Sequence, residues 1–162
     1  MKSKTAIFAA GCFWGVQYYF DQVPGVVKTT AGYTGGTTKN PDYWSIHQNE
    51  TGHVEAVFIE FGPKNVNYET LVMHFFRIHD PTAPNAADGV NIGSTYRSAL
   101  FYFNDDQKKA AEKVCDQVQK KYKKPIVTEF SRASKFYEAE PEHQKFTQRT
   151  GIGACHVDYA PI

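Results

Sequence analysis

A short apolar run, Ala6 to Ala10, leads directly into the pentapeptide GCFWG at residues 11–15, where two glycines bracket a cysteine and two aromatic residues. The run is typical of a buried strand, and Val16 to Phe20 is typical of a helix that ends before Pro24-Gly25. Because glycine adopts the backbone conformations of tight turns, the chain can pass from strand to helix within this pentapeptide. The pattern therefore places Cys12 at the beginning of a helix.

This position favours a reactive thiol. The unpaired N–H groups at a helix start and the positive end of the helix dipole favour an anion. For a cysteine that anion is the thiolate, which is the nucleophilic form. Lone cysteines are more often inert packing, so position alone leaves both interpretations open. The aromatic rings of Phe13 and Trp14 add a small apolar pocket beside the sulfur, and the whole pentapeptide favours the reactive interpretation.

The remaining apolar patterns predict an α+β fold. The glycine-rich stretch Ala31 to Gly36, with Asn40-Pro41, and the segment Pro81 to Gly93 are expected to be loops. The resulting order, β-α-β-β-α-β with an extra helix, predicts a two-layer sandwich of helices on a mixed β-sheet, with a split βαβ (ferredoxin-like) core and long loops. At 162 residues, one domain spanning residues 1–162 is expected. Strands are predicted at Val26–Thr30, His53–Phe61, Arg97–Phe103 and Ile126–Ser131, and helices at Asn67–Ile78, Asp105–Lys121 and Glu142–Arg149.

Composition excludes several classes of protein. The net charge of +1 and the absence of a basic stripe argue against nucleic-acid binding. No segment approaches the roughly 20 apolar residues that span a bilayer, and no signal peptide is visible. Three cysteines without a secretory signal indicate free thiols in a reducing compartment, the cytoplasm. Because neither a Cys-x-x-Cys pair nor a His-Glu-x-x-His motif occurs, we expect no metal and no tightly bound organic cofactor.

Glu55 is a candidate general acid. It lies in the predicted strand His53–Phe61 and shares a face with Val57 and Ile59. A carboxyl held against apolar surface has a raised pKa and can donate a proton near neutrality. The alternative is that Glu55 projects from the strand end into water, as glutamates usually do.

The other two cysteines differ in pattern. Cys115 has helical spacing with Ala111 and Val118, so it is expected on a buried helix face as a structural residue. Cys155 lies in the glycine-containing segment GIGACH at residues 151–156, and a mobile terminal segment suits a thiol that must reach a partner. Tyr33, Tyr43 and Tyr96 lie in or beside predicted loops, where they can donate O–H groups to a ligand or line the edge of a core.

The pentapeptide resembles the signature of the type A peptide methionine sulfoxide reductases. Four further groups of residues resemble that family's motifs and follow in the same order. The resemblance extends from about Ala6 to Cys155, nearly the whole chain. The matching groups are GYTGG at 32–36 with NPDY at 40–43, TGHVE at 51–55, YRSA at 96–99, and HQ at 143–144.

This resemblance implies an enzyme that reduces the S epimer of methionine sulfoxide, free or in proteins, to methionine. Cys12 would attack the sulfoxide sulfur while Glu55 protonates its oxygen. Phe13 and Trp14 would hold the substrate's ε-methyl group. Tyr43 and Tyr96 would hydrogen-bond the sulfoxide oxygen.

The resemblance also implies how the enzyme is reset. Cys12 is left as a sulfenic acid, and Cys155 condenses with it to an intramolecular disulfide. A thioredoxin-type reductant, or dithiothreitol in vitro, reduces that disulfide by exchange. The implied protein is a cytoplasmic monomer that repairs proteins under oxidative stress, binds no cofactor, and has an α+β sandwich fold.

The chain departs from the family pattern in the stretch Asp88-Gly89-Val90-Asn91. The family's acidic residue, which holds the substrate's main-chain N–H, falls on Asn91. Because charge-assisted hydrogen bonds are roughly twice as strong as neutral ones, we expect weaker recognition of the substrate backbone, or a replacement carboxylate from Asp88. Thr95, Glu142 and Ala154 also differ from the residues common in the family.

Two alternatives remain at the level of sequence. A cysteine hydrolase or acyl-transferase needs a histidine beside Cys12, and His53 is the candidate. A catalytically silent module would bind oxidised methionine through Phe13 and Trp14. Turnover that depends on a dithiol distinguishes the reductase from both, because a hydrolase consumes no reductant and a binding module turns nothing over.

Overall fold

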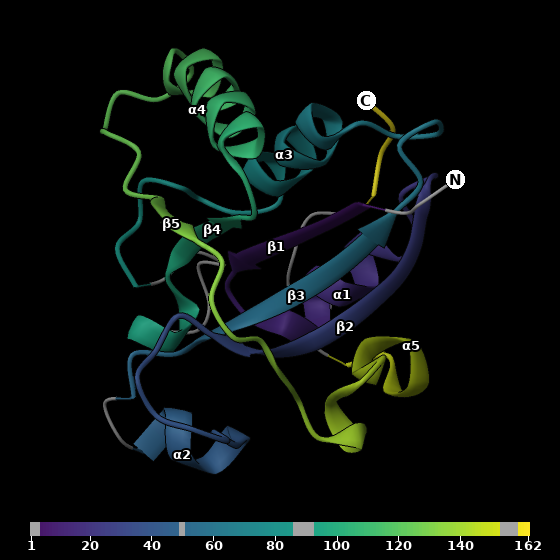
Figure 1. The fold of residues 1–162 in the computed structure, drawn as a ribbon, viewed down its shortest axis with the longest axis vertical. Helices are drawn as coiled ribbons and strands as arrows, with labels where there is room; N and C mark the ends of the chain where they lie inside the picture. Colours follow the sequence, from purple (N-terminus) through teal and green to yellow (C-terminus); the bar gives the residue numbers. More distant parts are fainter. Residues whose placement is uncertain (1–3, 49–50, 86–92, 153–158) are drawn as a thin grey trace.

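A mixed β-sheet forms the centre of the molecule (Figure 1), with the strand order β5-β4-β1-β3-β2-β6. The computed structural model describes residues 4–48, 51–85, 93–152 and 159–162. The strands are β1 (Lys4–Ala10), β2 (Val26–Thr34), β3 (Val54–Phe61), β4 (Ser98–Tyr102), β5 (Glu129–Arg132) and β6 (Tyr137–Glu138). The helices are α1 (Phe13–Phe20), α2 (Tyr43–Gln48), α3 (Tyr68–Arg77), α4 (Asp105–Gln119) and α5 (Phe146–Thr150), with short 3-10 helices η1 (Ser94–Tyr96) and η2 (Pro141–His143).

The pairing of the strands confirms the predicted fold class. β1 pairs antiparallel with both β3 and β4, and β2 pairs antiparallel with β3. β3 therefore lies between the parallel strands β1 and β2, which is the split βαβ arrangement. β5 extends this core in parallel beside β4, and β6 extends it antiparallel beside β2, which makes the sheet mixed.

Helices cover one face of the sheet. Phe8 of β1 packs against Phe20 of α1 and Phe75 of α3, with ring centroids 5.5 and 5.1 Å apart. On the opposite face, Ile7 and Phe101 belong to a smaller apolar cluster. Figure 1 shows α3 and α4 side by side, with α1 along β2 and β3. Within the described part of the chain, no helix is both long and apolar enough to span a membrane.

Three predictions near the candidate site are wrong in detail. α1 begins at Phe13, immediately after Cys12, rather than at Val16. β2 continues through Thr34, although Ala31 to Gly36 was predicted to be a loop. Gly32 is needed there for close approach rather than for a turn, because a Cβ atom on it would lie 2.4 Å from the carbonyl oxygen of Tyr137 on β6. α2 was not predicted.

The C-terminal half also differs from prediction. The strand predicted at Ile126–Ser131 is β5, which forms at Glu129 and lies at the sheet edge with exposed or half-buried residues. The helix predicted at Glu142–Arg149 is split into η2 and α5, because Lys145 between them has a left-handed φ of +57°. Of the predicted loop Pro81 to Gly93, residues 86–92 lie outside the described residues.

Candidate active site

Cys12 occupies the N-cap position of α1, as the sequence predicts. β1 ends at Ala10, and Gly11 turns the chain with a φ of +95°, a conformation that strongly favours glycine. Cys12 itself is extended, with φ −57° and ψ 122°, and the helix begins at the next residue. The side chain is buried, at 8% exposure. The sulfur therefore lies where backbone N–H groups favour an anion.

Glu55 lies directly beside this helix start. Its carboxyl Oε1 accepts a hydrogen bond from the backbone N–H of Phe13 at 3.1 Å. Its Oε2 lies 2.8 Å from Nε2 of His47. The residue is 1% exposed, so it does not project into water. Burial raises the pKa of the Glu55 carboxyl, and the hydrogen bonds from His47 and Phe13 partly oppose that rise.

Aromatic rings form a wall next to Cys12. Trp14 stacks on Tyr43 at 6.5 Å and on His143 at 5.8 Å, and its indole N–H donates to Nδ1 of His143 at 3.1 Å. Phe13 is fully buried behind this wall and packs against Tyr33. Of the two aromatic residues of the pentapeptide, Trp14 is partly exposed, whereas Phe13 packs from the inside against Tyr43 and His143.

Tyr43 and Tyr96 come together from α2 and η1, and their hydroxyl groups interact. The ring of His47 lies 4.4 Å from that of Tyr43 and 5.3 Å from that of Tyr96. Burial, and then the negative charge on Glu55, raises the pKa of both tyrosines. They therefore stay protonated and available as hydrogen-bond donors at neutral pH.

Tyr33 has a structural partner instead. Its hydroxyl donates to Oε1 of Glu140 at 2.7 Å, and Oε2 of the same carboxylate accepts the backbone N–H of Tyr43 at 3.1 Å. Gln144 fixes the same segment, since its amide oxygen accepts from the backbone N–H of Ala31 at 3.0 Å and its amide N–H donates to Ala31 O at 2.8 Å. Glu140 and Gln144 thus attach the segment after β6 to β2 and α2.

Sequence reasoning missed His47 and Glu140. His47 follows Tyr43 by four residues, which is helical spacing, but α2 has only six residues, with no apolar stripe to reveal it. Glu140 lies after the two-residue strand β6, which was also not predicted. Knowing that α2 exists would have placed Tyr43 and His47 on one helix face.

His53 does not serve Cys12. Its Nδ1 accepts the backbone N–H of Gly36 at 3.0 Å, and its Nε2 lies 2.8 Å from the carbonyl oxygen of Thr38. Both ring nitrogens therefore hold the loop after β2. This arrangement does not favour the hydrolase alternative, which needs a histidine that takes the proton of Cys12.

Two carboxylates and one imidazole lie close together beside the aromatic wall. Ligand atoms of Glu140, Glu142 and His143 are within 4.8 Å of one another. However, the Glu140 carboxylate already accepts from Tyr33 and Tyr43, and Nδ1 of His143 accepts from Trp14. Two of the three groups are therefore already engaged in hydrogen bonds within the protein.

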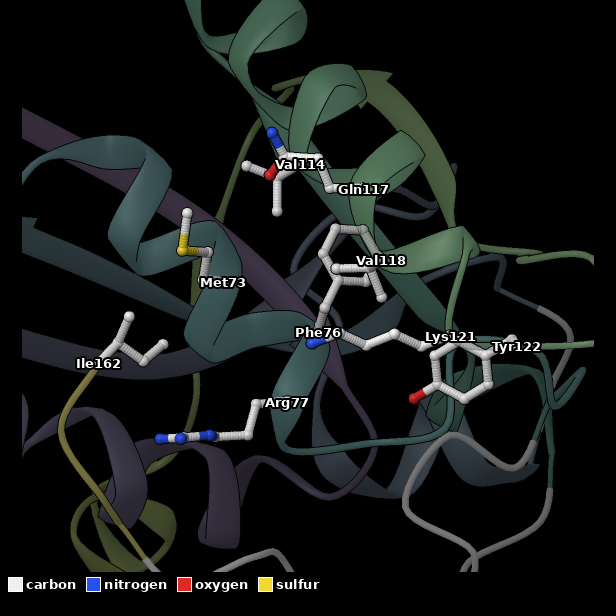
Figure 2. Close-up of a pocket in the computed structure, with 9 residues that line it drawn as sticks. All are labelled: Met73, Phe76, Arg77, Val114, Gln117, Val118, Lys121, Tyr122 and Ile162. Carbon is white, nitrogen blue, oxygen red and sulfur yellow. The ribbon is translucent and has the colours of Figure 1, made fainter.

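The remaining predicted residues lie elsewhere. Cys115 is half-buried in α4, where burial, and then the charges of Asp116 and Glu112, raises the pKa of its thiol. A hollow of about 440 Å³ lies between α3 and α4, and Figure 2 shows Ile162 on one side of it and Tyr122 on the other. This hollow shares no residue with the site around Cys12. Cys155, Asn91 and Asp88 lie outside the described residues.

Comparison with known proteins places this geometry in context. Residues 4–162 match the family described as peptide methionine sulfoxide reductase. The peptide methionine sulfoxide reductase MsrA of Methanosarcina acetivorans is 46% identical over 151 residues, which cover 92% of this chain and 80% of that protein. The MsrA of Nocardia farcinica is 45% identical over 157 residues, covering 95% and 89% of the two chains.

Solved structures of similar proteins also match this chain over nearly its whole length. The reduced form of Mxr1 from Saccharomyces cerevisiae superposes with a TM-score of 0.90 at 29% identity, over 98% of this chain and 93% of that chain. Mxr1 in complex with Trx2 gives a TM-score of 0.66 at 25% identity, over 99% and 91% of the two chains.

Proposed function

The chain belongs to the peptide methionine sulfoxide reductase family, and we propose that Cys12 is its nucleophile and Glu55 its general acid. The protein is a thiol-dependent oxidoreductase that reduces methionine sulfoxide to methionine. One observation carries the assignment of these two residues: the Glu55 carboxyl is hydrogen-bonded to the backbone N–H of Phe13, the residue next to Cys12. The acid and the nucleophile are therefore adjacent.

In the first step, the Cys12 thiolate attacks the sulfoxide sulfur. Glu55 gives its proton to the sulfoxide oxygen, which is a poor leaving group without it. The S–O bond to the substrate breaks, the hydroxyl moves to Cys12, and methionine leaves. Cys12 becomes a sulfenic acid, oxidised by two electrons, while the substrate sulfur is reduced by two.

The aromatic residues position the substrate. Trp14, stacked on Tyr43, supplies apolar surface for the ε-methyl group, and the buried Phe13 packs against Tyr43 from behind. The paired hydroxyls of Tyr43 and Tyr96 are protonated donors for the sulfoxide oxygen. This fixed placement is the basis for choosing the S epimer, free or within a protein. Asn91 is proposed to accept the substrate's main-chain N–H.

In the second half of the cycle, the Cys155 thiol condenses with the Cys12 sulfenic acid to a disulfide and releases water. A thioredoxin-type dithiol then reduces that disulfide by exchange. The structure of the related Mxr1 in complex with Trx2 supports a thioredoxin partner. The cycle consumes no further cofactor and suits a reducing compartment such as the cytoplasm. We propose that residues 1–162 act as one catalytic domain and as a monomer.

The test is dithiothreitol-driven reduction of the separated S and R epimers of a blocked methionine sulfoxide. Turnover of the S epimer alone, lost in Cys12→Ser, is the expected result. Reduction of both epimers at equal rates would contradict the proposed positioning of substrate. An inactive parent protein that still binds the sulfoxide would favour the silent module instead.

The proposed role of Asn91 has its own test. Asn91→Asp restores a charge at this position, so we expect an increase in kcat/KM for peptide substrates if Asn91 contacts the substrate backbone. Asp88→Ala lowers kcat/KM if Asp88 supplies the carboxylate instead. If neither variant changes kcat/KM, both versions of this hypothesis are wrong.

A further inference from the structure

Glu55 must recover a proton after every turnover, but its side chain is 1% exposed. Among the described residues, its carboxylate oxygens have two hydrogen-bond partners. Oε1 accepts the backbone N–H of Phe13, and a peptide N–H does not give up its proton at neutral pH. Oε2 lies 2.8 Å from Nε2 of His47. Of these two partners, only the imidazole can supply a proton.

We propose that His47 is a positioning residue that acts through Glu55 by returning a proton to its carboxylate after each turnover. This inference rests on the proposed function, in which Glu55 is the acid. The side chain of His47 is 19% exposed and thus reaches solvent, whereas its Nε2 contacts the buried carboxyl. Imidazole is the side chain that most readily gains and loses a proton between pH 5 and 8. His47 therefore connects the acid to bulk water.

The step balances as a simple proton transfer. When methionine leaves, Glu55 is a carboxylate and the hydroxyl resides on Cys12. His47 takes up a proton from water and, as an imidazolium, passes the Nε2 proton to Oε2 of Glu55. Glu55 becomes a neutral carboxylic acid, His47 becomes a neutral imidazole, and no electrons move.

The groups around this pair leave His47 as the direct partner of Glu55. The rings of Tyr43 and Tyr96 lie 4.4 and 5.3 Å from the His47 ring, and both hydroxyls stay protonated at neutral pH. The other described titratable groups that interact with the pair or with these two tyrosines are Tyr33 on β2, Cys12 before α1, His143 in η2 and Glu140, whose carboxylate accepts the backbone N–H of Tyr43. His143 is already hydrogen-bonded through Nδ1 to Trp14, which leaves His47 as the direct partner of Glu55.

The experiment compares two substitutions. His47→Gln places an amide N–H near the position of Nε2, so it keeps a hydrogen bond to Glu55 without a titratable proton. His47→Ala removes the ring and leaves a space that free imidazole can enter. We measure kcat and KM for the S epimer with excess dithiothreitol, from about pH 5.5 to about pH 9, with and without added imidazole. The rate at which dithiothreitol reduces the oxidised enzyme is recorded separately for each protein.

Both variants are expected to lose kcat by roughly tenfold to a hundredfold with little change in KM, since the missing step is a proton transfer. Added imidazole should restore kcat in His47→Ala but neither in His47→Gln, whose side chain fills the space, nor in the parent. The reduction of the oxidised enzyme should not differ among the three proteins.

Full activity in His47→Gln would overturn the inference, because a hydrogen bond would then suffice. An active His47→Ala that does not respond to imidazole would also overturn it. These outcomes differ from a failure of the proposed function, in which the parent itself does not reduce the sulfoxide. If His47→Ala does not fold, His47→Gln still decides the matter.

Discussion

The start of α1 and the middle of α4 each carry a cysteine, and the two environments differ in every property that controls a thiol. Cys12 precedes the first turn of α1, beside backbone N–H groups and the carboxyl of Glu55. Cys115 lies inside α4, where the backbone N–H groups around it are already hydrogen-bonded within the helix. Two carboxylates, those of Glu112 and Asp116, are close to its thiol. Burial alone would make Cys115 the more reactive thiol, because Cys12 is buried and Cys115 is only half-buried.

From this contrast we infer that placement at a helix start, rather than burial, favours a reactive thiol. Burial and the neighbouring negative charges raise the pKa of the Cys115 thiol, which keeps it protonated and unreactive. The hollow between α3 and α4 has no Glu or Asp among its lining residues that could serve as an acid. At Cys12 the chain supplies a helix start, a buried acid and two tyrosine hydroxyls together. A cavity or a cysteine alone does not make this chemistry.

The strongest test of the contrast is to remove each thiol in turn. Cys12→Ser is expected to lower the rate of sulfoxide reduction by roughly a thousandfold or more, because the serine hydroxyl is a poor nucleophile without a base. Cys115→Ser is the matched control and should change the rate less than about twofold. Dithiothreitol-driven reduction of the S epimer measures both. A large loss of reduction rate in Cys115→Ser, with the fold intact by circular dichroism, would contradict the assignment of Cys115 as a structural thiol.

The acid is the next difference between the two environments. Glu55→Gln keeps the size of the side chain but cannot donate a carboxyl proton, so kcat should fall by about 10²-fold to 10³-fold. The raised pKa of Glu55 means that its acid form persists to higher pH than for an exposed glutamate. Activity of the parent should therefore decline as the pH rises through that pKa, and Glu55→Gln should lose this decline. An unchanged pH profile would show that another group supplies the proton.

The turn that sets the start of α1 is a third difference. Gly11→Ala forces a side chain into a positive φ of +95°, which should cost about 1–3 kcal/mol of stability and displace Cys12. Gly151→Ala is the matched control, since Gly151 also has a positive φ (+72°) at the end of α5, with open space around it. Urea denaturation should show destabilisation in both variants. Only Gly11→Ala should also lower kcat. Equal kcat values in the two variants would show that the turn at Gly11 does not affect the reaction.

The smallest effect concerns the charges around Cys115. Asp116→Asn removes a negative charge and should lower the pKa of the thiol, so more thiolate forms at a given pH. We expect iodoacetamide to alkylate Cys115 about two to three times faster in this variant, and Cys12 at an unchanged rate. Peptide mass spectrometry resolves the two sites. A slower reaction at Cys115 would mean that access, rather than charge, limits it.

Local pattern sufficed to predict the centre of this site. The apolar run before Gly11 predicted the strand and the passage to a helix after Cys12, although the helix begins three residues earlier than predicted. The apolar neighbours Val57 and Ile59 made Glu55 a candidate buried acid, and the structure shows that it is buried rather than exposed to water. Both predictions depend on neighbours in sequence. The split βαβ core of strands β1 to β4 with helices packed on it was also predicted from the order of apolar segments, whereas β6 and the place of β5 at the sheet edge were not.

Features that depend on distant neighbours were not predicted. α2 is short and has no apolar stripe, so His47 gave no signal of its own, and its partner Glu55 comes from another element. Gly32 was mistaken for a loop residue. Its actual role is to let β6 approach closely, and the residues of β6 lie about a hundred positions later in the chain. Glu140 and Gln144 are likewise defined by contacts to β2 and α2 that no local pattern shows.

The most direct test of the account is to find which sulfur receives the substrate's oxygen. The Cys155→Ser variant is mixed with a single-turnover amount of the S epimer, treated with dimedone to trap sulfenic acid, and digested for peptide mass spectrometry. We predict that each methionine formed is matched by one dimedone adduct, located on the peptide that contains Cys12. An adduct on Cys115, or methionine formed while Cys12 stays unmodified and open to alkylation, would contradict the assignment of Cys12 as the nucleophile.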